Sequence, residues 1–167
     1  MRAGPDYSSG MRNLPRSAAV LTAAAIMAAA PAAHAGVGVG LFLGEPLGFT
    51  IKADLAQKTS LEVLLGVDDY DEDRGRDGYG HVTFLVAPFV AHGDSVSIPF
   101  RFGIGGAIYE DGPDDVGVGV RAPFQIAFQF HGSPFELYVE LSLLLRLVDN
   151  NDDLLDFGGG LGFRIYF

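Results

Sequence analysis

The chain has 167 residues, which is enough for one domain. Its 21 acidic side chains outnumber the 11 basic ones, and the formal net charge of −10 argues against non-specific binding to nucleic acid, whose phosphates would repel it. Because the sequence has no cysteine, it also excludes disulfides, thiolate chemistry and cysteine-ligated metals.

Residues 1–35 have the features of a secretory signal peptide. Arginines precede an apolar, alanine-rich run from Ala18 to Ala30, and a small-x-small cleavage site ends at Ala35. The run is too short for a membrane-spanning helix, which needs about 20 residues. A buried core helix is the weaker alternative, and Met11 is a second possible start of translation. We therefore expect an exported mature chain of residues 36–167.

After residue 35 apolar residues alternate with small or polar ones, without the i, i+3, i+4 spacing of an amphipathic helix. This alternation is typical of β-strands, because successive side chains of a strand point to opposite faces of the sheet. Eight segments are predicted to be strands: residues 36–43, 47–56, 60–67, 79–90, 95–108, 116–130, 135–148 and 154–167.

The predicted strands are joined by connections of two kinds. Three are short turns: residues 57–59, 91–94 and 131–134. The others are a turn at residues 44–46 and three acidic loops without apolar periodicity: residues 68–78, 109–115 and 149–153. In an up-and-down arrangement all short turns lie at one end and all acidic loops at the other, where we expect them to be extracellular. This asymmetry is typical of single-chain outer-membrane barrels.

One predicted face is apolar and nearly free of charge, whereas the other carries glycines and most of the charges. Since the interior of an eight-stranded barrel is only just wide enough for side chains, we expect the glycine-rich, charged face inside. An unpaired buried charge costs several kcal/mol, so these charges are expected to form a network of ion pairs that plugs the lumen. The predicted network contains Lys52, Asp54, Glu62, Arg101, Arg121, Glu136, Glu140, Arg146 and Arg164.

Aromatic residues near the strand ends are candidates for interfacial girdles, and ordinary apolar packing is the alternative for each of them. The candidates at the acidic-loop end are Tyr79, Tyr109 and Phe157. Those at the other end are Phe89, Phe100, Phe130, Phe135, Tyr166 and Phe167.

The last strand alternates up to a terminal aromatic residue, through Phe163, Ile165, Tyr166 and Phe167. This ending resembles the insertion signal of bacterial outer-membrane β-barrels. With the glycine-rich hairpin of residues 38–48, it makes the mature chain similar to the small eight-stranded barrels of the OmpA transmembrane domain and OmpX type. The resemblance implies an all-β fold, an eight-stranded antiparallel up-and-down transmembrane β-barrel. It also implies a monomer in the bacterial outer membrane that contacts outer-membrane lipid and is inserted by the barrel-assembly machinery, with no cofactor and no catalytic residues.

Motifs for catalysis or metal binding are weak. The segment His81-Val82-Thr83 departs from the His-x-Ser of barrel lipid deacylases, so His81 is expected to form hydrogen bonds at the rim of the lumen. Glu136 and Glu140 share a face but have arginines available as partners, which argues against an acid/base pair. The run from Asp69 to Asp73 lacks the glycine and glutamate of an EF-hand loop. A solvated loop is expected there, with a divalent-cation site as the weaker hypothesis.

The sequence therefore predicts a non-enzymatic, structural outer-membrane barrel with a plugged polar lumen and acidic extracellular loops. Three alternatives remain open: a narrow channel for small solutes, a lipid-modifying barrel enzyme and a soluble calycin-like binding barrel.

Overall fold

The computed structural model describes residues 36–68, 77–110, 115–148 and 154–167. These residues belong to one compact unit, His34–Phe167. The expected signal peptide and most of the expected acidic loops, including the Asp69 to Asp73 run, lie outside the described residues. Within the part of the chain that is described, no helix has the length and hydropathy needed to cross a bilayer.

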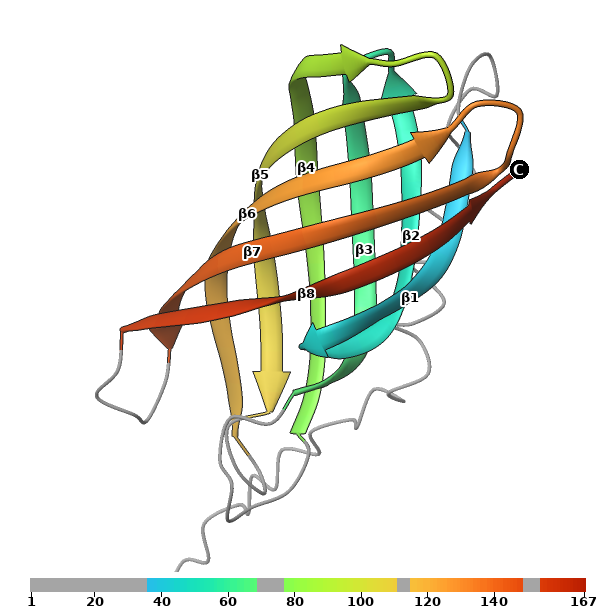
Figure 1. Ribbon diagram of the computed structural model, residues 1–167. Coiled ribbons are helices and arrows are strands. Elements are labelled where there is room, and N and C mark those ends of the chain that lie inside the picture. Colours follow the sequence, from blue (N-terminus) through green and yellow to red (C-terminus); the bar gives the residue numbers. More distant parts are fainter. Residues whose placement is uncertain (1–35, 69–76, 111–114, 149–153) are drawn as a thin grey trace, which may run out of the picture. The chain divides into compact units, whose positions relative to one another are not determined.

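Eight β-strands form the unit, and each pairs antiparallel with its neighbours in the chain. They are β1 (Val37–Glu45), β2 (Leu47–Ala56), β3 (Thr59–Asp68), β4 (Asp77–His92), β5 (Val96–Glu110), β6 (Val116–Phe130), β7 (Phe135–Val148) and β8 (Leu155–Tyr166). Because β1 also pairs with β8, the sheet closes into an up-and-down barrel (Figure 1). The predicted eight-stranded antiparallel up-and-down β-barrel and all eight predicted strands are confirmed.

Three strand ends, of β3, β4 and β5, reach further into the acidic segments than the sequence predicted. Asp68 at the end of β3 pairs with Asp77 at the start of β4, and Glu110 still pairs with Val116. Hydropathy cannot separate a polar strand end from a loop, because the ladder there is held by backbone hydrogen bonds rather than by apolar side chains.

The closing seam between β1 and β8 includes the last residue of the chain. The register runs from Gly38 opposite Tyr166 to Glu45 opposite Gly159. The Phe167 amide donates to the Val37 carbonyl at 3.0 Å, and the Val37 amide donates back at 3.4 Å. The terminal residue is therefore part of the ladder that removes both free edges of the sheet.

The two faces of the sheet have opposite polarity, and they are the faces predicted from the alternation. Large apolar side chains point outward and are exposed, with Leu141 at 64% and Ile104 also at 64%. Charged side chains point inward and are at most 2% exposed at six positions: Lys52, Glu62, Arg121, Glu136, Glu140 and Arg164. This arrangement is the reverse of a soluble barrel with an apolar cavity.

A β-bulge in β4 changes which residues face the interior near His92. The register moves by one residue between Val86, opposite Phe102, and Phe89, opposite Phe100. An extra residue on one strand reverses the alternation beyond it. Val90 is consequently opposite Pro99 on the interior face. Unbroken alternation over the predicted strand 79–90 places Val90 on the apolar exterior with Val82 and Val86, and this prediction is wrong.

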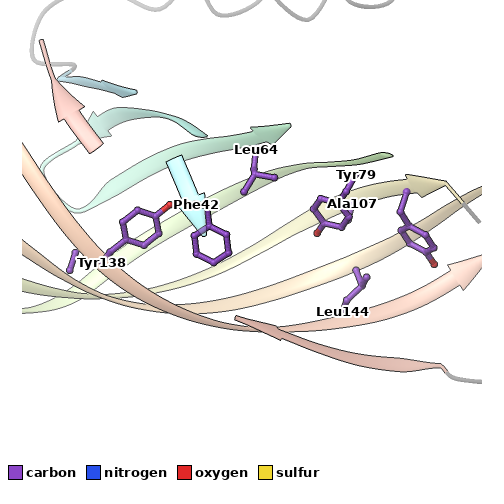
Figure 2. Packing of buried hydrophobic residues seen from close by; sticks show 8 residues of the cluster. Phe42, Leu64, Tyr79, Ala107, Tyr138 and Leu144 are labelled. Carbon is purple, nitrogen blue, oxygen red and sulfur yellow. The ribbon is translucent and has the colours of Figure 1, made fainter. Parts of the chain in front are cut away.

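The interior tyrosines lie over glycines of the neighbouring strand. Tyr138 is opposite Gly162, where an added Cβ would be 1.9 Å from the ring, and Tyr109 is opposite Gly117, where it would be 2.1 Å from the ring. Only glycine leaves room for these rings. Figure 2 shows Tyr138 beside Phe42, with their ring centroids 5.9 Å apart.

Three of the candidate girdle residues face the lumen instead of the exterior. Tyr79 and Tyr109 are 6% and 3% exposed, and the ring of Tyr166 lies 5.2 Å from the Lys52 ammonium. Inside the barrel the rings of Tyr109 and Tyr166 face the cations of Arg146 and Lys52, which an apolar exterior does not offer. The candidate phenylalanines Phe89 and Phe157 are exposed on the exterior.

Candidate functional site

The charged interior, which we call the lumen network, is the candidate site. It consists of the nine predicted charges and Asp156, and its members come from β2, β3, β5, β6, β7 and β8. Each strand contributes residues of one parity only, because the interior face of a strand repeats every second residue.

Arg164 lies at the centre of the lumen network and has no exposed surface. Its guanidinium forms an ion pair with Glu62 and donates from Nη1 to Glu136 Oε1 at 3.0 Å and from Nε to Thr50 Oγ1 at 3.3 Å. The guanidinium carbon also lies 3.8 Å from the ring centroid of Tyr138. One side chain therefore connects β8 to β2, β3 and β7 across the interior.

Glu136 collects cationic partners from two other strands. Arg101 donates to it through both terminal nitrogens, at 3.0 and 2.6 Å, which is the bidentate geometry that gives the strongest ion pairs. Gln129 adds a hydrogen bond of 2.8 Å. Lys52 forms an ion pair with Asp54, which is two residues away on the same face of β2. This end of the lumen network is consequently filled by paired charges.

Gln125 joins two carboxylates of like charge. Its amide nitrogen donates to Glu62 Oε2 at 3.0 Å and to Glu140 Oε2 at 2.6 Å. Glu140 is also ion-paired with Arg121, and Glu62 with Arg164. The two carboxylates can share a buried site because each has its own arginine. Gln125 carries no charge, so the predicted network of ion pairs did not include it.

Asp156 is a member of the lumen network that sequence reasoning missed. Arg146 Nη2 lies 3.2 Å from Asp156 Oδ2, and the Arg146 guanidinium lies 5.5 Å from the ring centroid of Tyr109. Adding Asp156 makes five acidic residues for five basic ones. The alternation of the last strand contained the signal, since residue 156 belongs to the same series as Gly158 and Arg164.

His81 is buried rather than at an exposed rim, which corrects the expectation for this residue. It is 3% exposed, and its Nε2 lies 3.6 Å from Glu62 Oε1, which is too long for a hydrogen bond. Neither ring nitrogen has a hydrogen-bond partner among the described residues. The described part of the chain also contains no group of three or more His, Asp or Glu residues arranged to hold a metal ion.

The four residues of the expected insertion signal are split between the two faces. Phe163 and Phe167 are exposed outside, and Ile165 lies on the same face. Tyr166 points inward, below Lys52. The role of these residues in insertion stays a prediction.

Comparisons with known proteins identify the fold. No family model matches the chain, and no curated protein sequence matches it. The N-terminal β-barrel domain of Pseudomonas aeruginosa OprF is similar in structure, with a TM-score of 0.55 and 14% identity over 79% of this chain and 97% of that one. The structure of the Yersinia pestis outer membrane protein Ail in a phospholipid bilayer nanodisc gives a TM-score of 0.42 and 15% identity, over 80% of this chain and 100% of that one. The chain therefore shares its barrel fold with the N-terminal domain of OprF.

Proposed function

We propose that the chain is a structural, non-enzymatic barrel that spans the bacterial outer membrane and is closed by its own lumen network. The observation that carries this proposal is the reversed polarity of the sheet. Leu141 is 64% exposed while Arg164, on the adjacent strand, is fully buried. Exposed large apolar side chains occur on all eight strands. An apolar surface that surrounds the whole barrel is unfavourable in water and marks contact with lipid or another protein.

The strands and their closure fit a bilayer. They are 9 to 16 residues long, and a tilted transmembrane strand needs about 9 to 11 residues. In hydrocarbon every backbone polar group must be paired within the protein, and a closed barrel meets this requirement because it has no edge. We therefore propose outer-membrane lipid as the partner of the exterior. We further propose that the chain acts as a monomer and is inserted by the barrel-assembly machinery through β8.

The interior supports a plug rather than an open pore. Arg164 on β8 and Gln125 on β6 have no exposed surface, and both contact Glu62 on β3 across the barrel. Eight strands leave an interior that side chains can fill. Moving a solute past these contacts would require separating buried ion pairs, which costs several kcal/mol for each charge left unpaired.

Refolding the full chain tests this proposal. In detergent or liposomes we expect a folded barrel that migrates differently on gels with and without boiling, and we expect precipitation when the detergent is removed without lipid. A monomeric, folded protein in buffer without detergent would contradict the proposal and favour the soluble binding barrel.

A narrow channel is the second candidate function, and a cavity of ≈ 690 Å³ that reaches Lys52 and Arg101 from one end favours it. Planar bilayers containing the refolded chain decide between the two functions. The plugged barrel predicts no discrete conductance steps, whereas reproducible steps would establish the channel.

A further inference from the structure

The cavity of ≈ 690 Å³ opens at the end of the barrel that carries the β2–β3, β4–β5 and β6–β7 turns. We call it the vestibule. Interior residues of β2 to β6 line it, together with the β2–β3 turn. Its volume is in the range of small-molecule sites, about 300 to 1,000 Å³. The plug function uses the charged floor of this cavity but gives no role to the cavity itself.

The β4 bulge shapes the vestibule. Beyond it Val90 and His92 are opposite Pro99 and Ser97, and all four residues line the cavity. The Ala87 amide donates to the Lys58 carbonyl at 2.8 Å, which ties β4 to the β2–β3 turn. Figure 1 shows the β4–β5 hairpin at the same end of the barrel as this turn. Without the bulge, Val90 and His92 would face the exterior.

Basic side chains gather in the vestibule although the chain as a whole is acidic. Three basic residues line the cavity: Lys52, Lys58 and Arg101. Among the described residues, Asp54 is the one acidic residue that lines it. Glu136 lies behind Arg101 and neutralises it. Asp54 likewise neutralises Lys52. The excess of positive charge at this site is therefore one unit, that of Lys58, in a protein of net charge −10.

The donors that remain favour a phosphate group over a carboxylate. A carboxylate is best bound by the bidentate fork of an arginine, but both terminal nitrogens of Arg101 are already used by Glu136. The other donors are the Lys58 ammonium, the N–H groups that the Lys52 ammonium does not give to Asp54, and the hydroxyl groups of Thr59 and Ser60. Lysine binds phosphate as a point charge, and hydroxyl groups add single hydrogen bonds to its several oxygens.

We propose that the vestibule binds a phosphate monoester, with the phosphate between Lys52 and Lys58 and the organic part against Leu55 and Val90. The ligand is either a soluble phosphate ester or the headgroup of a lipid that carries a terminal phosphate. The site belongs to the barrel itself, so the proposal does not depend on whether the lumen conducts.

Titration of glycerol 3-phosphate into the full chain in octyl glucoside, which contains no phosphate, tests the proposal. We expect saturable binding by calorimetry and chemical-shift changes at the amides of Lys58, Ser60 and Ser97. Acetate at equal ionic strength is expected to bind at least about tenfold more weakly, because it makes fewer hydrogen bonds. Equal binding of acetate and glycerol 3-phosphate would overturn the proposal. So would the absence of binding of both phosphate probes, glycerol 3-phosphate and the phosphatidic acid described next.

A second arm distinguishes the two sources of the phosphate. The chain is placed in phosphatidylcholine nanodiscs with and without phosphatidic acid. Shift changes at the same amides with phosphatidic acid alone identify a lipid headgroup, whereas changes with glycerol 3-phosphate identify a soluble ester. No change in either arm contradicts the proposal.

Two variants locate the site. Lys58→Gln removes a cation from a turn, where folding is little affected, and is expected to weaken binding about tenfold. Asp94→Asn changes the charge by one unit on the neighbouring turn but does not line the cavity. It is expected to leave binding unchanged, and tighter binding by this variant would indicate attraction by net charge alone. Unchanged binding by Lys58→Gln would also refute the site.

Discussion

Replacing Glu136 by glutamine tests whether the lumen network holds the barrel together. Glu136 is fully buried and accepts four hydrogen bonds, two from Arg101, one from Arg164 and one from Gln129. Glutamine has the shape of the glutamate side chain but not its negative charge, and its NH₂ group would face the N–H donors of Arg101, Arg164 or Gln129. Removing one partner of a buried ion pair typically costs about 3 to 5 kcal/mol. We expect a loss of this size in the free energy of unfolding.

The assay is urea unfolding of the full chain in detergent micelles, followed by far-ultraviolet circular dichroism, since the chain has no tryptophan. Asp94→Asn is the matched control, because it removes the same charge at an exposed turn and is expected to change stability by less than about 0.5 kcal/mol. The double variant Arg101→Leu with Glu136→Leu removes both charges of the bidentate pair and leaves Arg164 paired with Glu62, so it is expected to recover at least half of the loss. If Glu136→Gln is as stable as Asp94→Asn, the network does not stabilise the fold.

Gly162→Ala is expected to lower the free energy of unfolding by about 1 to 3 kcal/mol, because the added Cβ would overlap the ring of Tyr138. Gly106→Ala is the control in the same urea assay, and it is expected to change stability little because the nearest atom to its Cβ is 4.0 Å away. Leu141→Arg is expected to destabilise the barrel in liposomes by about 2 to 4 kcal/mol, and Asp94→Arg is the neutral control; equal effects would argue against lipid at residue 141. Deletion of Phe167 is expected to reduce the folded barrel recovered from outer membranes several-fold, and unchanged recovery would remove its role in insertion.

The strands and their faces could be predicted because a barrel strand has a simple period. Successive side chains of a barrel strand point in turn to the exterior and to the lumen. The alternation of β7 from Phe135 to Arg146 therefore predicts both the strand and which of its faces lies inside. The charged face could be assigned to the interior from the narrow width of eight strands alone.

The contacts within the site could not be predicted, because alternation contains no register. Arg164 and Glu62 meet although 102 residues separate them, and only the stagger of the closed sheet brings them to one level. The β4 bulge reversed the face of Val90 without any signal in hydropathy. A tyrosine near a strand end is compatible with an interfacial girdle or with the lumen, and the glycine opposite Tyr109 makes room for its ring in the lumen.

The central claim is that lipid surrounds the apolar face and that the charged face is sealed inside. Because the chain has no cysteine, single nitroxide labels can be attached at Leu141→Cys and at the exposed turn position Asp94→Cys in liposomes. We predict that the label at residue 141 relaxes with oxygen but not with a water-soluble nickel chelate, and that the label at residue 94 does the reverse. Strong relaxation of the label at residue 141 by the nickel chelate would contradict the account.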